Sequence, residues 1–177
     1  MNKLTSLTQP AFNTADIADQ LGPLARCVPM QWLSLGGRRS FHGTLSTLRC
    51  RDAVGLLRQC IDEPGAGRVL LVDGGGSRAA ALLGDRMAQR AADKGWAGLL
   101  IHGAVRDADA LASIDIGVFA LARTPVRACG EPSGERDVPV VLDGVTLHPG
   151  SHLFCDGDGL VVCSAQDAQA ILVPGSR

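Results

Sequence analysis

The chain has 177 residues, of which 46% are hydrophobic and 20% charged, and its formal net charge is −1. This length suits one compact domain with a core of its own, and the composition is ordinary for a globular protein. The near-neutral charge gives no electrostatic reason to expect direct binding of nucleic acid. Aromatic residues make up only 3% of the chain, too few for base-stacking platforms.

The first residues and the cysteines bear on the expected location of the protein. The first ten residues are mostly polar and lack the apolar core of a signal peptide, and no run is long enough to span a membrane. The six cysteines are scattered without a Cys-x-x-Cys pair, so we expect reduced thiols that act as small core residues. We therefore predict a flexible tail over residues 1–10, a single domain over 11–177, and a cytoplasmic location without membrane contact.

The first part of the chain contains two predicted helices and a strand between them. The apolar spacing predicts a short helix over residues 14–21, with Thr14 as its capping residue. Residues 41–48 are typical of a strand with a glycine bend. Residues 52–61 have helical spacing, and this helix should end before the Glu-Pro-Gly sequence that begins at Glu63.

The middle of the chain alternates buried strands and helices. The predicted strands cover residues 68–72, 98–101 and 118–121. A helix is expected over 77–94, and a shorter one after a loop at 102–105 and the pair Arg106-Asp107. This β-α-β-α-β order argues for parallel strands with crossover helices.

The last part changes to short β runs separated by turn-rich segments. These runs cover residues 138–145, 152–155 and 160–163. The predicted fold class is therefore α/β, with a parallel-strand α/β layer packed against a β-rich layer.

Several kinds of chemistry are excluded or disfavoured. The two lysines are Lys3 in the tail and Lys94 at the end of a predicted helix, and neither setting offers the desolvation that a Schiff-base lysine needs. The chain has no Gly-x-Ser-x-Gly elbow, no His-Glu-x-x-His motif and no Cys/His cluster for zinc.

A glycine run, Gly74 to Gly76, follows the strand at 68–72. Its backbone N–H groups could hold an anion or a substrate carboxylate at the start of the next helix. Alternatively it is only a tight strand-to-helix turn. Asp73 favours the turn, since its carboxylate would repel an anion.

The most informative unit is Arg106-Asp107, just past a predicted parallel strand. Ligands of open α/β sheets bind at that edge. The guanidinium of Arg106 suits a carboxylate with a neighbouring carbonyl oxygen, and Asp107 is a hard oxygen ligand for Mg²⁺ or Mn²⁺. The alternative is an arginine in a loop and an aspartate that caps the next helix, and the spacing alone favours this alternative.

Motifs along most of the chain carry a resemblance to a known family. They are Gly-Gly-Arg at 36–38 with Ser-Phe at 40–41, RVLLVDGGG at 68–76, GAVR at 103–106, and PGSHL at 149–153 followed by Asp156 and Gly159. From about Phe12 to Cys163 the sequence resembles the regulator of ribonuclease E activity A. The resemblance implies a swivelling β/β/α domain and a homotrimer or hexamer with sites at subunit interfaces.

That family includes class II 4-hydroxy-4-methyl-2-oxoglutarate aldolases, which carry Asp-x20-Arg-Asp. Asp85, Arg106 and Asp107 match this pattern. The resemblance implies a divalent-metal-dependent lyase that releases pyruvate and also decarboxylates oxaloacetate. In it Arg106 would bind the carboxylate and C2 oxygen of a small 2-oxo acid, Asp107 would be the direct metal ligand, and Asp85 would hold the waters of the metal.

Backbone N–H groups from Gly84 to Met87 would help to bind the substrate carboxylate. Only this backbone role transfers to Arg86, because the family usually has an apolar residue there. His102 stands at a position where aldolases often have an aspartate, and this difference leaves the substrate preference open. It is close enough to the motif to be a candidate lining residue.

The resemblance leaves two other functions to weigh. A protein-binding inhibitor of ribonuclease E without catalysis is the main alternative, although members known as ribonuclease regulators can lack the second aspartate that this chain keeps as Asp107. A methyltransferase, a label that the family has sometimes carried, is disfavoured. No glycine loop is followed by an acidic ribose-binding residue at a suitable spacing.

Overall fold

The structure is a computed structural model that describes residues 12–173, so the tail predicted over 1–10 lies outside the described residues. Its helices are α1 (Thr14–Leu21), α2 (Gly55–Asp62), α3 (Asp85–Asp93), α4 (Ala108–Leu111) and α5 (Ala165–Leu172). Its strands are β1 (Arg26–Cys27), β2 (Leu33–Ser34), β3 (Phe41–Arg49), β4 (Val69–Asp73), β5 (Ala81–Leu83), β6 (Gly98–Val105), β7 (Gly117–Arg123), β8 (Glu135–Arg136), β9 (Val140–Leu142), β10 (Val145–Leu147), β11 (His152–Asp156) and β12 (Gly159–Cys163).

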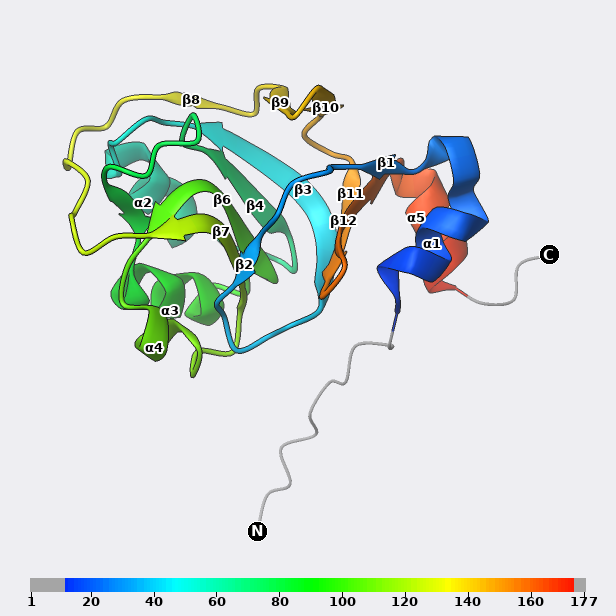
Figure 1. The fold of residues 1–177 in the computed structure, drawn as a ribbon, viewed down its shortest axis with the longest axis horizontal. Helices are drawn as coiled ribbons and strands as arrows, with labels where there is room; N and C mark the ends of the chain where they lie inside the picture. Colours follow the sequence, from blue (N-terminus) through cyan, green and yellow to red (C-terminus); the bar gives the residue numbers. More distant parts are fainter. Residues whose placement is uncertain (1–11, 174–177) are drawn as a thin grey trace, which may run out of the picture.

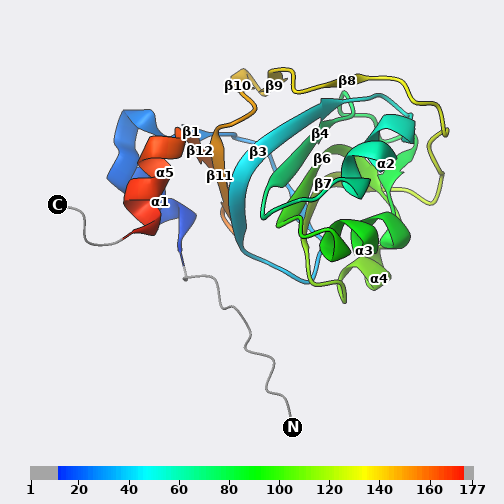
Figure 2. The same cartoon turned by 180° about the vertical axis from the view of Figure 1, so that it is seen from behind.

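The α/β layer is built on four neighbouring strands. β3, β4, β6 and β7 pair in parallel, in that order, and β5 adds to the end of β6. Helices α2, α3 and α4 lie in the crossovers and cover one face of these strands (Figures 1 and 2). A buried apolar cluster fills the space between them and includes Leu57 of α2 and Leu70 and Leu99 of the sheet. The predicted β-α-β-α-β order is confirmed.

The β-rich layer covers the other face of the same strands. β11 and β12 form an antiparallel pair that joins the sheet through β3. Leu153 of β11 and Val162 of β12 belong to one buried cluster with Leu71 of β4 and Leu100 of β6. The long strand β3 therefore belongs to both layers (Figure 1), and the expected packing of an α/β layer against a β-rich layer is confirmed.

Helices α1 and α5 pack together on the outer side of β11 and β12 (Figure 2). The predicted helix over 14–21 is confirmed, but its cap is wrong. Asn13 is the N-cap, and its side chain accepts from two N–H groups of the first turn. Thr14 instead donates its N–H and its hydroxyl to the buried Asp156, at 2.7 and 2.6 Å. That pair ties α1 to β11. Helix α5 was not predicted from the sequence.

The largest error concerns the helix predicted over residues 77–94. The helix α3 begins only at Asp85, and Ala81–Leu83 form the strand β5, which is buried at all three positions. Alanine and leucine are good helix formers, but here tertiary pairing with β6 and with the backbone beside Arg127 decides the conformation. The loop predicted at 102–105 is likewise the end of β6, paired with β5 and β7.

The glycine run after β4 does not begin a helix. Gly75 and Gly76 have φ of 65° and 70°, and the N–H groups of Gly74 and Gly76 both donate to the carbonyl of His102. The run is thus a turn between two strands, with its N–H groups used inside the fold. The strand-to-helix geometry required for anion binding there is absent. The helix predicted from residue 52 also begins later, at Gly55, because Asp52 has φ of 52°.

The thiols largely behave as expected. Cys50, Cys60, Cys155 and Cys163 are buried and none is in a disulfide, and burial raises the pKa of Cys50 to about 12. Cys27 and Cys129 are exposed, so not all six cysteines are core residues.

No helix between residues 12 and 173 is long and apolar enough to cross a membrane.

Candidate active site

Arg106 and Asp107 directly follow the carboxyl end of β6 and therefore lie at the edge of the sheet. The N–H of Arg106 donates to the carbonyl of Leu83 at 2.9 Å, which fixes this point beside the end of β5. Asp107 then adopts φ 58° and ψ 40°, a left-handed conformation that aspartate tolerates better than most residues. Its side chain makes no capping hydrogen bond to α4. Asp107 therefore occupies the N-cap position of α4, but its side chain does not cap the helix.

The carboxylate of Asp107 turns instead toward the start of α3. Its Oδ2 lies 3.4 Å from the backbone N of Asp85 and 3.4 Å from Nε of Arg106. This approach requires a glycine at position 84, because a Cβ atom there would lie 2.6 Å from the same Oδ2. The motif aspartate and arginine are thus brought against the N-terminus of α3.

Asp85 is the first residue of α3, and its Oδ1 accepts from the N–H of Arg86 at 2.7 Å. Two of the backbone N–H groups expected to bind a substrate carboxylate therefore face carboxylates of the protein in this structure. A negative charge at a helix N-terminus is favoured by the helix dipole. This end of α3 is suited to an anion, whether side chain or ligand.

A cavity of about 530 Å³ opens at this point. All the residues singled out by the Asp-x20-Arg-Asp pattern and its neighbours line it, namely Gly84, Asp85, Arg86, Met87, Arg106 and Asp107. The side chains of Arg106 and Asp107 are each 38% exposed, so both are accessible to a small ligand. The structure thus brings together in one cavity the six residues that the family resemblance assigns to the site.

Other residues that line this cavity were not predicted from the sequence. Arg58 comes from α2, Arg90 from the end of α3, and Arg127 from the segment after β7. None belongs to a motif, and their approach depends on how distant elements pack. The only available signal was that nearly all the basic residues of the chain are arginines.

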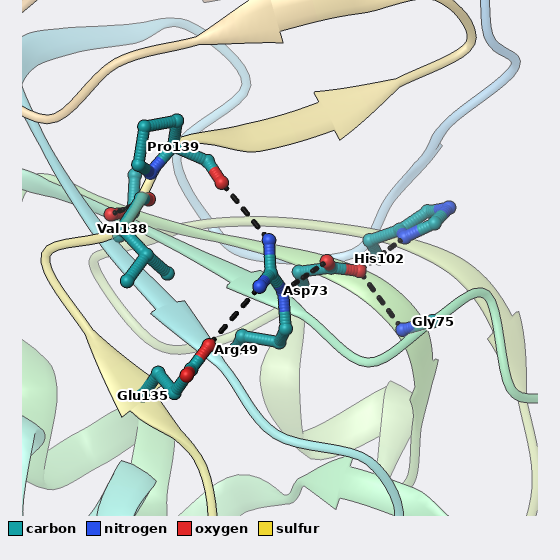
Figure 3. A network of polar contacts seen from close by, with 8 residues as sticks. Arg49, Asp73, Gly75, His102, Glu135, Val138 and Pro139 are labelled. Carbon is teal, nitrogen blue, oxygen red and sulfur yellow. Dashed lines mark hydrogen bonds and ion pairs between the residues drawn. The ribbon is translucent and has the colours of Figure 1, made fainter.

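His102 does not line this cavity, contrary to the possibility raised by its position. Its Nδ1 lies 2.9 Å from Oδ1 of Asp73, which also accepts from the N–H of Gly75 (Figure 3). Arg49 completes the network by bonding to Asp73 and Glu135. The hydrogen bond with His102 lowers the pKa of Asp73. The network joins β3, β4, β6 and β8.

The donor set of the cavity fits a hard divalent cation. Mg²⁺ usually binds one or two carboxylates and completes its shell with water and substrate oxygens. Asp107 and Asp85 supply two such carboxylates in one cavity. Within residues 12–173 no group of three or more His, Cys, Asp or Glu side chains could enclose a metal ion.

Fold and site together define an α/β protein whose candidate site lies at the carboxyl edge of parallel strands. The family described as RraA-like, Aldolase/RraA, matches residues 14–162. The chain belongs to this family, and the resemblance noted in the sequence is confirmed.

The relatives carry different names. A 4-hydroxy-4-methyl-2-oxoglutarate aldolase from Thermus thermophilus is 48% identical over 149 residues, which are 84% of this chain and 90% of the relative. The RNA-processing inhibitor RraA from Thermus has a TM-score of 0.84 and 47% identity, over 86% of this chain and 93% of that one. A structure described as an S-adenosylmethionine:2-dimethylmenaquinone methyltransferase from Geobacillus kaustophilus also has a TM-score of 0.84, with 39% identity over 86% of this chain and 95% of its own.

Proposed function

We propose that the protein is a divalent-metal-dependent class II aldolase that cleaves 4-hydroxy-4-methyl-2-oxoglutarate or similar substrates to pyruvate and also decarboxylates oxaloacetate. The name of the 48% identical relative supports the aldolase activity. The observation that carries the proposal is the convergence of Arg106, Asp107 and Asp85 on one cavity. An arginine and two carboxylates are the groups needed to hold a 2-oxo acid beside a cation.

The residues of the site would share the work of binding. Arg106 would donate to the substrate carboxylate and to its 2-oxo oxygen, which fixes the plane of the pyruvyl half. The first turn of α3 would receive the other carboxylate oxygen at its N–H groups, with Asp85 moving off the N–H of Arg86. Asp107 would hold Mg²⁺ or Mn²⁺ directly and Asp85 through water.

Both reactions pass through the enolate of pyruvate. In aldol cleavage the bond between C3 and C4 breaks, its electron pair enters the enolate, and the C4 hydroxyl loses its proton. In decarboxylation the same electron pair is left when CO₂ departs, and C3 then takes up a proton in either case. A divalent cation bound at this site supplies polarisation of the 2-oxo group. Arg106 adds positive charge beside the same oxygen, and this contact strengthens as the enolate forms.

The remaining expectations from the family are part of the same proposal. We propose a homotrimer or hexamer with sites at the subunit interfaces, and a cytoplasmic location. Light scattering of the purified chain would test the assembly. A monomer with full activity would show that the site is complete in one subunit.

Pyruvate release from oxaloacetate, followed with lactate dehydrogenase, tests the proposed function. We expect a rate that needs Mg²⁺ or Mn²⁺, is abolished by EDTA, and exceeds the metal-catalysed background measured without enzyme. Asp107→Asn should lose about a hundredfold or more, since one ligand charge disappears. Asp109→Asn, an exposed change two residues away on α4, should keep wild-type activity. Equal rates for the two variants would contradict the proposal.

A second candidate function follows from the RNA-processing inhibitor that shares the fold. In this alternative the protein binds ribonuclease E and lowers its activity without catalysis of its own. An assay of RNA cleavage by ribonuclease E, with and without the protein, tests it directly. Inhibition by wild type and by Asp107→Asn alike, together with no metal-dependent release of pyruvate, would favour the inhibitor over the enzyme.

A further inference from the structure

Two histidines form a pair where β3 and β11 meet, away from the candidate active site. His42 belongs to β3 and His152 to β11, and neither lines the candidate cavity. Nδ1 of His42 and Nε2 of His152 lie 3.0 Å apart. The two strands lie side by side (Figure 1) and pair directly, with Phe154 opposite His42 in the register. The backbone ladder therefore sets the positions from which both rings extend.

Aromatic side chains hold the two imidazole rings in place. The ring of His42 is stacked on Phe154, with centroids 5.5 Å apart, and the ring of Phe12 meets it edge-on at 5.5 Å. Phe154 also contacts His152, with 4.9 Å between the ring centroids. Both histidines are half-buried among these rings. The two facing nitrogens are therefore prearranged, unlike those of a histidine that moves freely at the surface.

A hydrogen bond from one imidazole to the other would be the simplest explanation of the 3.0 Å distance. It requires one of the facing nitrogens to carry a proton. Within residues 12–173 no group fixes this choice, because Nε2 of His42 and Nδ1 of His152 have no partner, and neither is a buried atom. His102 differs, since Asp73 holds its Nδ1. Both rings of the pair can therefore adopt the tautomer that leaves the facing nitrogen with a free lone pair.

The same distance fits a metal ion held by both rings. A bond of about 2.0–2.1 Å from a metal to an imidazole nitrogen places two neighbouring ligands about 2.9 Å apart at a right angle and about 3.3 Å apart at the tetrahedral angle. The observed 3.0 Å lies in this range. Neutral imidazole is the form that binds metals, and burial lowers the pKa of both rings, to about 4 for His152.

The ligand atoms determine the class of ion. Imidazole nitrogen favours ions such as zinc and nickel, whereas Mg²⁺ favours oxygen ligands. Within residues 12–173 no third His, Cys, Asp or Glu joins the pair, so the two rings cannot enclose an ion by themselves. Water must therefore complete the coordination shell. Such a site is open and differs from a structural zinc site, in which four protein ligands surround the ion.

We infer that His42 and His152 form a second metal site, for a divalent transition-metal ion of the zinc and nickel class, with Nδ1 of His42 and Nε2 of His152 as its protein ligands. Binding moves the shared proton from its facing nitrogen to the far nitrogen of the same ring, so no proton is released overall. The ion links β3 to β11, the strand pair that joins the two layers of the fold. The site is independent of the proposed function, because it uses neither Asp85 nor Asp107.

Isothermal titration calorimetry of the untagged protein with Zn²⁺ and with Ni²⁺ tests the site. Excess Mg²⁺ keeps the added ion from the candidate active site. We expect His42→Gln and His152→Gln each to weaken the tightest binding by at least about tenfold, since even the loss of an outer partner of a metal ligand costs about 10–100-fold. His148→Gln removes an exposed imidazole outside the pair and is the matched control, which should keep the wild-type affinity. Equal affinities in the wild type and every variant would overturn the inference.

Nitrogen NMR of the histidine rings gives a second test on the wild type alone, which serves where circular dichroism shows that a variant is unfolded. Zn²⁺ should shift the resonances of Nδ1 of His42 and Nε2 of His152 together, as a single site fills, and leave His148 unchanged. Shifts confined to other histidines, or no shift in any ring, would contradict the site. Asp107→Asn should lose the proposed activity yet keep these shifts, so the failure of one proposal is distinguishable from the failure of the other.

Discussion

The change Gly84→Ala probes the site at the point where it is most tightly packed. The added Cβ atom would lie 2.6 Å from Oδ2 of Asp107 and 3.3 Å from both Cγ and Nε of Arg106. All three are side-chain atoms, which can move without distorting the backbone. To reach ordinary van der Waals contact the carboxylate of Asp107 must shift by roughly 1 Å. The substitution therefore displaces the proposed metal ligand while leaving both functional side chains in place.

The expected effect on activity is large and that on stability is small. A misplacement of about 1 Å at a catalytic group can cost roughly a hundredfold in rate. The backbone of Gly84 has φ −136° and ψ −178°, an extended conformation that alanine adopts freely. Alanine restricts the unfolded chain, which stabilises by about 0.4–1 kcal/mol, but it is a poorer N-cap than glycine by a similar amount. The net change in the free energy of unfolding should be within about 1 kcal/mol.

Two measurements on one preparation decide this prediction. Metal-dependent release of pyruvate from oxaloacetate gives kcat/KM, and urea unfolding gives stability. Gly157→Ala is the matched control, since a Cβ atom there has no neighbour within 4 Å and should leave both quantities unchanged. Full activity in Gly84→Ala would refute the reasoning that the position of the Asp107 carboxylate controls the reaction. Low activity accompanied by unfolding would refute the claim that the change is local.

Three further changes test the fold, each by urea unfolding. Leu57→Ala empties a fully buried position between α2 and the sheet and should cost about 2–5 kcal/mol. The hydrogen bond from His102 lowers the pKa of Asp73, so its stabilisation is present above the unfolded pKa of about 3.9 and is lost as pH falls. Asp73→Asn should therefore lose less stability between pH 6 and pH 3 than the wild type. Burial, with a contribution from His42, lowers the pKa of His152 to about 4. The unfolded chain then takes up this proton first, so stability falls as pH drops from about 6.5 to 4, and His152→Gln should weaken that loss. A His152→Gln profile identical to wild type would contradict the last of these.

The strands of the α/β layer could be predicted from sequence because they are continuous apolar runs between turn residues. β4 and the first half of β6 are of this kind, and both are buried on both faces. β5 could not be predicted in this way, since Ala81–Leu83 lead directly into an amphipathic helix and nothing local separates the two. Its strand conformation depends on pairing with β6 and with residues near Arg127, which are distant in sequence.

The residues of the candidate site also differ in whether they could be predicted from the sequence. Asp85, Arg106 and Asp107 could be found because their spacing matches a family motif, and the structure places all three in one cavity. Arg58 and Arg127 carry no such pattern. They reach the cavity only because α2 packs beside α3 and because the segment after β7 pairs with β5. Side chains that depend on such packing are found from coordinates rather than from sequence.

Two polar clusters lie at the edge of the parallel strands. Their hydrogen bonds distinguish an aspartate with a structural role from one that can bind a ligand. Asp73 accepts from Arg49, Gly75 and His102, and its side chain is 14% exposed. A carboxylate with its lone pairs so engaged holds strand ends together and has little capacity left for a ligand. The side chain of Asp107 is 38% exposed, and within residues 12–173 its carboxylate makes two polar contacts, both at 3.4 Å, which are long for a charged acceptor. The same residue type at the same edge is therefore structural after β4 and free to bind after β6, and this difference supports the proposal that Asp107 is the metal ligand.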